Sequence, residues 1–183
     1  MIRLPVRSRF VPVILALCAG LAACAGDPAA DPAARKIPVQ IPRTLPYAED
    51  AASGAIRADC SFPTYLPQKI VEEAASRHIT VELSDADLAE VKQGRVLRIK
   101  TLYLEASDGG GYTGEKKARI RGELLQDGRV IGDFTIQRNT GRSWPPWSGW
   151  TACSSLERDA DALAEDVAEW LTAPQMGTRE GDQ

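Results

Sequence analysis

The strongest constraint on the fold is an alternation of apolar and polar residues with a period of two, which runs from Val96 to Asn139. Successive side chains of a strand point to opposite faces of a sheet, so this period predicts β-strands. Glycine-containing breaks divide the run into strands over 96–106, 116–125 and 129–138. The sequence therefore predicts a three-strand antiparallel meander.

The turn between the last two of these strands decides which residues face each other. A two-residue turn at Asp127-Gly128 places the apolar residues of the two strands on opposite faces of the sheet. A loop one residue longer sets Ile120 opposite Phe134, and it also sets Arg121 opposite Asp133 as a favourable charge pair. Because only the longer loop gathers the apolar residues on one face, we expect that register.

A first helix is expected before the meander, over residues 64–78. Its apolar residues recur every three or four positions and form one face, which is typical of an amphipathic helix packed on a core. Pro67 falls in the first turn of this range, where a missing N–H breaks no helical hydrogen bond. A short β-prone run at 79–83 follows the helix.

A second helix is expected after the meander. Ser154 and Glu157 have the spacing of a capping box at its start, and Pro174 ends it. Its apolar residues repeat at helical spacing: Leu156, Ala160, Leu163, Val167, Trp170 and Leu171. Together the elements predict an α+β fold, in which an antiparallel meander sheet of three to five strands packs two helices on one face.

The chain begins with a segment that has the organisation of an export signal. Residues 1–10 are basic, with Arg3, Arg7 and Arg9, and residues 11–22 are apolar. A stretch of about a dozen apolar residues is shorter than the roughly 20 needed to span a bilayer, and it has the length of a signal-peptide core. We therefore expect residues 1–23 to be removed on export.

The residues that end this segment, Leu21-Ala22-Ala23-Cys24, resemble the lipobox of bacterial lipoproteins. The resemblance covers residues 1–24 and implies that the chain is cut before Cys24, whose thiol takes up lipid. The alternative is an ordinary secretory peptide in which Cys24 is incidental. By the same resemblance, several acyl chains hold the mature N-terminus stably on a membrane. Position 25 is alanine rather than the aspartate associated with inner-membrane retention, so we expect an outer-membrane anchor facing the periplasm.

Two further cysteines, Cys60 and Cys153, lie in the expected folded part. Disulfides persist outside the cytoplasm, and neither cysteine has a CxxC partner, so a structural disulfide is favoured over a redox pair or a metal site. Such a bond would close a loop of roughly 90 residues, which is worth about 4–5 kcal/mol in the chain-entropy account. It would also join the starts of the two helices.

The mature chain divides into a tether, a domain and a tail. Residues 24–53 are rich in alanine and proline at their start and are expected to form the tether, residues 54–174 a single domain, and residues 175–183 a frayed tail. Within the tether, residues 37–42 alternate apolar residues with proline and glutamine. This pattern favours an extended segment or edge strand that lies along the domain or stays loose, and the alternative is a peptide that docks on a partner's sheet edge.

The charge of the chain excludes some classes of partner. The chain has 22 basic and 25 acidic residues, and loss of the three leader arginines leaves 19 basic against 25 acidic, a net charge of −6. Nucleic-acid binding requires clustered cations, so we expect no nucleic-acid partner. The same balance argues against electrostatic docking on anionic lipid.

The residues that support catalysis are scarce. His78 is the only histidine and lies at the end of the first helix, where it complements the helix dipole, so neither a hydrolytic triad nor a zinc site is expected. Glu123 and Asp133 share the polar face of the sheet, but Arg121 between them favours a salt bridge over a glycosidase pair. We expect neither an enzyme, nor a metal, nor a cofactor.

One loop has an unusual composition. Trp144, Trp147 and Trp150 fall within seven positions, and two prolines separate the first two. Indole rings stack on sugars, prolines and cations, so exposed rings would indicate a contact with a glycan or a protein. The alternative is that the rings cover the disulfide and one end of the core.

The order of elements and the hairpin at 121–132 resemble those of small uncharacterised proteobacterial envelope lipoproteins, and more loosely the periplasmic modules of envelope-assembly lipoproteins. The resemblance implies a non-enzymatic interaction or assembly role with an envelope protein partner. A carbohydrate-binding module that uses the tryptophan loop is the alternative.

Overall fold

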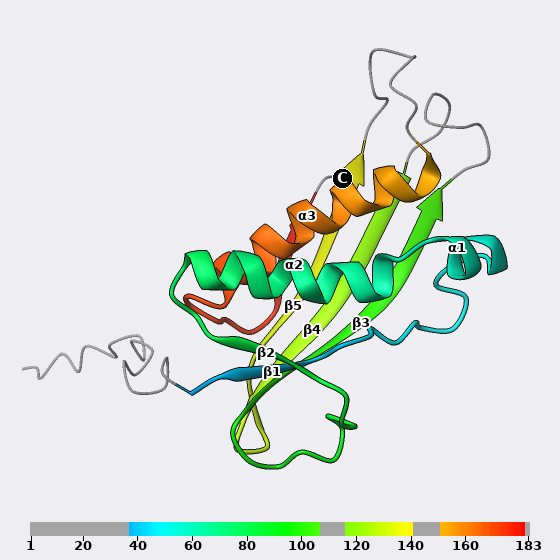
Figure 1. The fold of residues 1–183 in the computed structure, drawn as a ribbon. Coiled ribbons are helices and arrows are strands. Elements are labelled where there is room, and N and C mark those ends of the chain that lie inside the picture. The colour runs from blue at the N-terminus through cyan, green and yellow to red at the C-terminus, as the bar shows by residue number, and fades with distance from the viewer. Residues whose placement is uncertain (1–36, 107–115, 141–150, 182–183) are drawn as a thin grey trace, which may run out of the picture.

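The computed structural model describes residues 37–106, 116–140 and 151–181. They form one six-stranded sheet with the order β2-β1-β3-β4-β5-β6, and α2 and α3 lie side by side across one of its faces (Figure 1). The elements are β1 (Val39–Pro42), α1 (Gly54–Asp59), α2 (Phe62–Ser76), β2 (Val81–Ser84), β3 (Arg95–Ala106), β4 (Lys116–Gln126), β5 (Arg129–Thr140), α3 (Ala152–Trp170) and β6 (Thr178–Gly181). Within the described ranges, no helix combines the length and apolar character needed to cross a bilayer.

The expected α+β class is confirmed, but the described residues form six strands rather than three to five, and a short helix, α1, adds to the two expected. The sheet is also mixed rather than a pure antiparallel meander. The central strands β3, β4 and β5 are the predicted meander and lie within two residues of the predicted ranges. Strand β1 pairs in parallel with both β2 and β3, and β6 pairs in parallel with β5. The parallel strands are four residues each, too short for their period to stand out in the sequence.

The predicted register of the second hairpin is wrong. The turn is the two-residue Asp127-Gly128, with φ of 50° and 80°, and Gln126 pairs with Arg129. A bulge then leaves Ile131 as an extra residue of β5, because Leu125 pairs with Val130 while Leu124 pairs with Gly132. The extra residue returns the apolar sets to one face, which a two-residue turn alone could not do. The resulting partners are Ile120 with Ile136, Gly122 with Phe134, Arg121 with Thr135 and Glu123 with Asp133.

The segment 37–42 is part of the sheet rather than of a tether. Strand β1 lies between β2 and β3, and Val39 and Ile41 are fully buried. Pro42 is tolerated because pairing with β3 ends two residues earlier, at Gln40, so no ladder donor is missing there. The domain therefore begins well before residue 54, and these residues are not available as an extended docking peptide.

The expected frayed tail contains a strand. β6 pairs with residues 134–137 of β5, and the turn before it is fixed by two contacts. The Gly177 N–H donates to Asp133 Oδ1 at 2.8 Å, and the Asp133 N–H donates to the Gln175 carbonyl at 3.1 Å. Trp170 Nε1 also donates to Thr178 Oγ1 at 3.1 Å. Side chains distant in sequence thus order a polar segment that shows no strand period of its own.

Helix α2 begins two residues before the predicted start, so Pro67 lies in its second turn and not its first. Proline has no N–H, which leaves the carbonyl of Pro63 without its helical donor. The N–H of Leu45 donates to that carbonyl at 2.9 Å, and the Leu45 side chain is buried. The irregularity in α2 is therefore the point at which the chain after β1 attaches to the helix.

Helix α3 has a different cap from the predicted one. Its N-cap is Thr151, whose Oγ1 accepts the Ser154 N–H at 3.2 Å, while Ser154 Oγ accepts the Thr151 N–H at 2.9 Å. The two reciprocal bonds form a capping box three residues earlier than expected. Glu157, expected to close the box, instead accepts the hydroxyl of Ser61 at 3.0 Å.

The disulfide between Cys60 and Cys153 is present, with a Cα–Cα distance of 5.1 Å. Cys60 directly precedes the N-cap of α2, and Cys153 lies in the first turn of α3. As predicted, the bond joins the starts of the two helices. It closes a loop of 93 residues that contains the whole meander.

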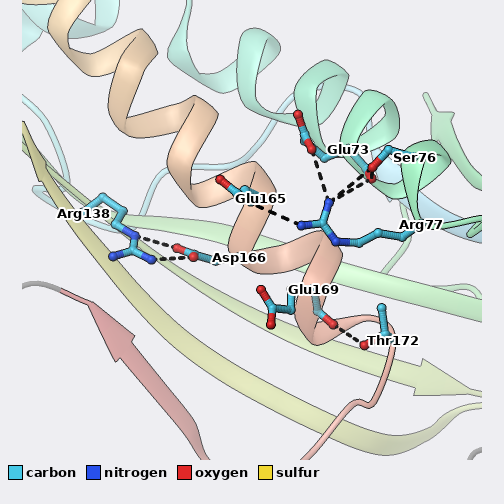
Figure 2. A network of polar contacts seen from close by, with 8 residues as sticks. All are labelled: Glu73, Ser76, Arg77, Arg138, Glu165, Asp166, Glu169 and Thr172. Atoms are coloured by element: carbon cyan, nitrogen blue, oxygen red, sulfur yellow. Dashed lines mark hydrogen bonds and ion pairs between the residues drawn. The ribbon is translucent and has the colours of Figure 1, made fainter.

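Polar contacts hold the other ends of the helices. Figure 2 shows Arg77, just after α2, reaching Glu73 on its own helix at 3.3 Å and Glu165 on α3 at 3.9 Å. Arg138 of β5 donates to Asp166 of α3 at 2.7 Å, which ties that helix to the sheet. The carboxylates that Arg77 reaches are exposed, so those pairs add little to stability and mainly fix the position of the helices. Arg138 and Asp166 are mostly buried and make two parallel hydrogen bonds, so this pair is the firmer connection.

The core lies between the two helices and the apolar face of the sheet. Phe134 meets Trp170 of α3 edge to face, with ring centroids 4.8 Å apart. The far edge of the Phe134 ring lies against Gly122, where an added Cβ would overlap the ring. Glycine is required there by close packing rather than by its backbone conformation. The largest fully buried side chains include Phe62, Leu66, Ile70, Leu97, Ile120, Leu124, Ile136, Leu156 and Leu163.

We expect Gly122→Ala to lower the free energy of unfolding by about 2 kcal/mol, because the methyl group must displace a buried aromatic ring. Gly54→Ala is the matched control, since nothing lies within 4 Å of its added Cβ and alanine is the better helix former. Urea denaturation of both variants measures the difference. Equal stability of the two variants would show that the Phe134 ring can move without cost.

Candidate functional site

A groove of about 560 Å³ lies on the sheet face opposite α2 and α3. Its floor is formed by β3 and β4, and its two walls by the segments 42–46 and 86–89. The volume falls within the range of small-molecule sites, roughly 300–1,000 Å³. The lining residues are Pro42, Thr44, Pro46, Ala86, Asp87, Leu88, Ala89, Arg98, Ile99, Lys100, Leu102, Arg121 and Glu123.

The wall formed by 86–89 belongs to the loop between β2 and β3. Leu88 is its buried apolar residue, and Val96 and Leu125, which are register partners pointing to this face, are buried as well. None of the three belongs to the main core between the helices and the sheet. Burial of Leu88 favours the position of the loop on the polar side of the sheet.

Arg98 fixes the same wall to β3. Its Nε donates to the Leu88 carbonyl at 3.1 Å and its Nη2 to the Ala89 carbonyl at 2.9 Å. Asp87 Oδ1 accepts the Ala89 N–H at 2.9 Å, which closes a tight turn. Arg98 is opposite Glu123 in register but is committed to these carbonyls, so its role is to position the wall.

The wall formed by 42–46 is part of the chain between β1 and α1. It leaves β3 after Gln40 and returns at Tyr47, where the Thr101 N–H donates to the Pro46 carbonyl at 2.9 Å. Arg43 Nε on this wall donates to Asp85 on the other at 2.7 Å. That hydrogen bond holds the pKa of Asp85 below its usual value and raises the pKa of Arg43. Because both side chains are exposed, the bridge orients the walls more than it stabilises them.

Two cations lie together on the floor of the groove. Lys100 of β3 and Arg121 of β4 are direct register partners in the antiparallel pair. Arg121 Nη2 is 3.2 Å from Glu123 Oε1, whereas the Lys100 ammonium makes no hydrogen bond or ion pair with any residue in the described ranges. Like charges directly opposite each other on adjacent strands destabilise a sheet. The facing charges of Lys100 and Arg121 therefore do not contribute to the stability of the sheet.

A bulge in β3 supplies the apolar part of the floor. Thr101 pairs with Ile120 and Tyr103 with Arg119, so Leu102 is an extra residue without a register partner. Leu102 lines the groove beside Lys100 instead of alternating to the helix side. Bulges re-aim side chains in this way, and here the result is an apolar residue next to a cation.

The carboxylates on the polar face of the sheet are engaged by neighbouring groups. Glu123 and Asp133 are direct register partners, not separated by Arg121 as predicted, and each has a partner of its own: Arg121 for Glu123 and the Gly177 N–H for Asp133. His78 directly follows the C-cap residue of α2, and its backbone φ is 59°. Within the described part of the chain, no three histidine, cysteine or carboxylate side chains are grouped to hold a metal ion.

The sequence-predicted site residues have different outcomes. Cys60 and Cys153 form the disulfide described above. Cys24 and the tryptophans Trp144, Trp147 and Trp150 lie outside the described residues, so lipidation and the tryptophan-loop hypothesis stay predictions.

The groove was not predicted from the sequence. The sequence does show that basic residues alternate along β3 and β4. Arg98 and Lys100 are two positions apart, and so are Arg119 and Arg121. What the sequence does not give is their pairing across the strands, which depends on the bulge at Leu102. The loop at 86–89 has no period at all, so its position over the sheet could not be inferred.

Comparisons with known proteins give neighbours in structure but none in sequence. No family model and no curated protein matches the chain. Similar solved structures include protein XCC0632 of Xanthomonas campestris, described under the family model DUF330, with a TM-score of 0.50, 12% identity, and coverage of 74% of this chain and 83% of that one. The PelC dodecamer from Paraburkholderia phytofirmans has a TM-score of 0.48 and 16% identity over 77% and 90% of the two chains. A minor lipoprotein from Acinetobacter baumannii has a TM-score of 0.44 and 10% identity over 75% and 93%.

These neighbours are proteobacterial, and the name of the Acinetobacter protein calls it a lipoprotein. At 12% identity, the similarity to the Xanthomonas protein establishes a shared fold and transfers no site residue. The groove must therefore be interpreted from its own chemistry.

We expect Lys100→Gln to raise the free energy of unfolding by about 0.5 kcal/mol at low salt, because it removes one of two like charges that face each other. The gain should shrink in 1 M NaCl, where charges are screened within about 3 Å. Arg119→Gln changes the net charge equally, but it removes a hydrogen bond to Gln137 and should bring no gain. Urea denaturation at both salt concentrations compares them, and a loss of stability in Lys100→Gln would mean that the lysine has a stabilising partner.

Proposed function

We propose that the chain is a non-enzymatic lipoprotein of the cell envelope, anchored by acyl chains on Cys24. It holds a partner protein on the face of its sheet that no described helix covers, called the uncovered face below. The basic segment, the apolar stretch and Leu21-Ala22-Ala23-Cys24 support the anchor, and Ala25 favours the outer membrane, facing the periplasm. The disulfide is of the kind that persists in an oxidising compartment and supports export.

The observation that carries the partner proposal is the charge on the uncovered face. Although the chain is acidic overall, this face of β3 and β4 carries exposed Lys100, Arg119 and Arg121 beside exposed Tyr103. Complementary charge steers association and selects partners. A partner with an acidic surface matches this face, whereas the helix side of the sheet is already occupied by the core.

The absence of an enzymatic role is part of the proposal. The carboxylates nearest the groove are engaged: Glu123 by Arg121, and Asp87 by the Ala89 N–H. Each carboxylate keeps further lone pairs, but the described lining of the groove has no histidine or cysteine to act with it. We therefore assign binding rather than catalysis to this surface.

The anchor is tested by metabolic labelling with a radioactive or alkyne-bearing palmitate. The wild-type chain should incorporate the label and fractionate with membranes, because a lipoprotein signal ends in an acylated cysteine. Cys24→Ala should lose both the label and the processing. Cys18→Ala is the matched control, since it changes the other cysteine of the leader. Equal labelling of Cys24→Ala and the wild type would contradict the anchor.

The partner surface is tested by placing a photo-crosslinking amino acid at Thr135, which is half-buried on the uncovered face of β5. Irradiation of intact cells should give a discrete adduct with an envelope protein. The control position is Glu165, exposed on α3 on the opposite side of the sheet, where no such adduct is expected. When Arg119→Gln and Arg121→Gln are combined with the probe at Thr135, the adduct should become weaker. The same adduct from both positions, or none from Thr135, would contradict this surface.

A further inference from the structure

We propose that the groove between 42–46 and 86–89 binds a single-chain amphiphile with an anionic head group, whose alkyl chain lies along the apolar walls and whose head lies between Lys100 and Arg121. This inference goes beyond the proposed function, because it assigns a small-molecule ligand and does not depend on a protein partner. It rests on the composition of the walls, on the charges of the lining and on the backbone groups that the groove offers.

The walls present hydrocarbon on both sides. Pro42 and Pro46 face the groove from one wall, Ala86, Leu88 and Ala89 from the other, and Leu102 from the floor. An alkyl chain that enters gains about fourfold in affinity for each CH₂ that it buries. A groove of about 560 Å³ has room for a ligand of this class while remaining open at the surface.

The charges of the lining select an anion. The basic residues are Arg98, Lys100 and Arg121, and the acidic ones are Asp87 and Glu123. Arg98 is committed to loop carbonyls and Glu123 faces Arg121, which leaves the Lys100 ammonium without a counter-charge in the described ranges. A carboxylate or phosphate between Lys100 and Arg121 would remove the repulsion between them and accept charge-assisted hydrogen bonds from both.

A peptide is a poorer match than an alkyl chain. A bound peptide must pair its own N–H and C=O groups, as it does when it adds to a sheet edge. The floor strands β3 and β4 are paired with each other along the groove, so they offer no edge. Pro42 and Pro46 have no N–H to donate, and the Pro46 and Ala89 carbonyls already accept from Thr101 and Arg98. An alkyl chain needs none of these groups.

The test uses the full chain, processed and purified from its own membrane and placed in nanodiscs of neutral phosphatidylcholine. The probes are a diazirine-bearing fatty acid and the fatty alcohol of the same chain length. After irradiation, mass spectrometry locates the labelled peptides. We expect the acid to label peptides that contain 86–89 or 98–102, and the alcohol to label them about tenfold less, because a charge-assisted bond contributes about that factor.

Variants separate the groove from general contact with the bilayer. Lys100→Gln with Arg121→Gln should lower labelling by the acid about tenfold, and Leu102→Gln should lower labelling by both probes. Arg129→Gln is the control: it removes one exposed positive charge of β5 that does not line the groove, and it should leave labelling unchanged. Urea denaturation shows that each variant is folded.

Equal labelling by acid and alcohol, undiminished labelling of the double variant, or labels spread over the helices would each overturn the proposal. These outcomes are independent of the palmitate label on Cys24 and of the adduct from Thr135. Failure of the groove proposal is therefore distinguishable from failure of the proposed function.

Discussion

Among the described residues, helices cover one face of the sheet only, and this constraint determines how its strands are built. Each long strand must keep a continuous apolar set towards α2 and α3 and a polar set towards the other side. Two bulges maintain this division where simple alternation would fail. The extra residue Ile131 restores the apolar face of β5 after a two-residue turn. The extra residue Leu102 shifts the alternation by one position, so Thr101 and Leu104 are both buried although they are three positions apart. Each bulge also places one apolar side chain on the polar face, and Leu102 becomes part of the groove.

The connections between the helices and the start of the domain explain how this one-sided arrangement is held together. The disulfide between Cys60 and Cys153 joins the starts of α2 and α3, and in the chain-entropy account its long loop is worth about 4–5 kcal/mol. Leu45 completes the hydrogen bonding that Pro67 interrupts in α2, and in doing so it attaches the wall 42–46 to the helix layer. The groove is thus bounded by a segment that is fixed to the core on its other side.

How much of this could be predicted depended on whether a feature is local or distant in sequence. The meander and the last helix have long, regular periods, and the disulfide followed from having two cysteines without other partners, so all three were predicted. Strands β1, β2 and β6 have four residues each, and partners distant in the chain, such as Asp133 for Gly177 before β6, decide that they form. The hairpin register was predicted wrongly because a bulge has no sequence signal of its own at Ile131. The pairing of Lys100 with Arg121 could not be predicted either, because it depends on the bulge at Leu102.

Bulk charge and local charge lead to different conclusions here. The net charge of −6 expected for the mature chain is an average over the whole molecule, and it argues against long polyanions, which must contact many cations at once. A single anionic group responds only to charges within about one Debye length, roughly 8 Å under physiological conditions. On that scale the floor of the groove is basic, because register brings Lys100 and Arg121 together while Glu123 balances only one of them. A predominantly acidic protein can therefore repel a nucleic acid and still hold one carboxylate or phosphate, provided that an apolar wall beside the cations supplies the rest of the binding energy.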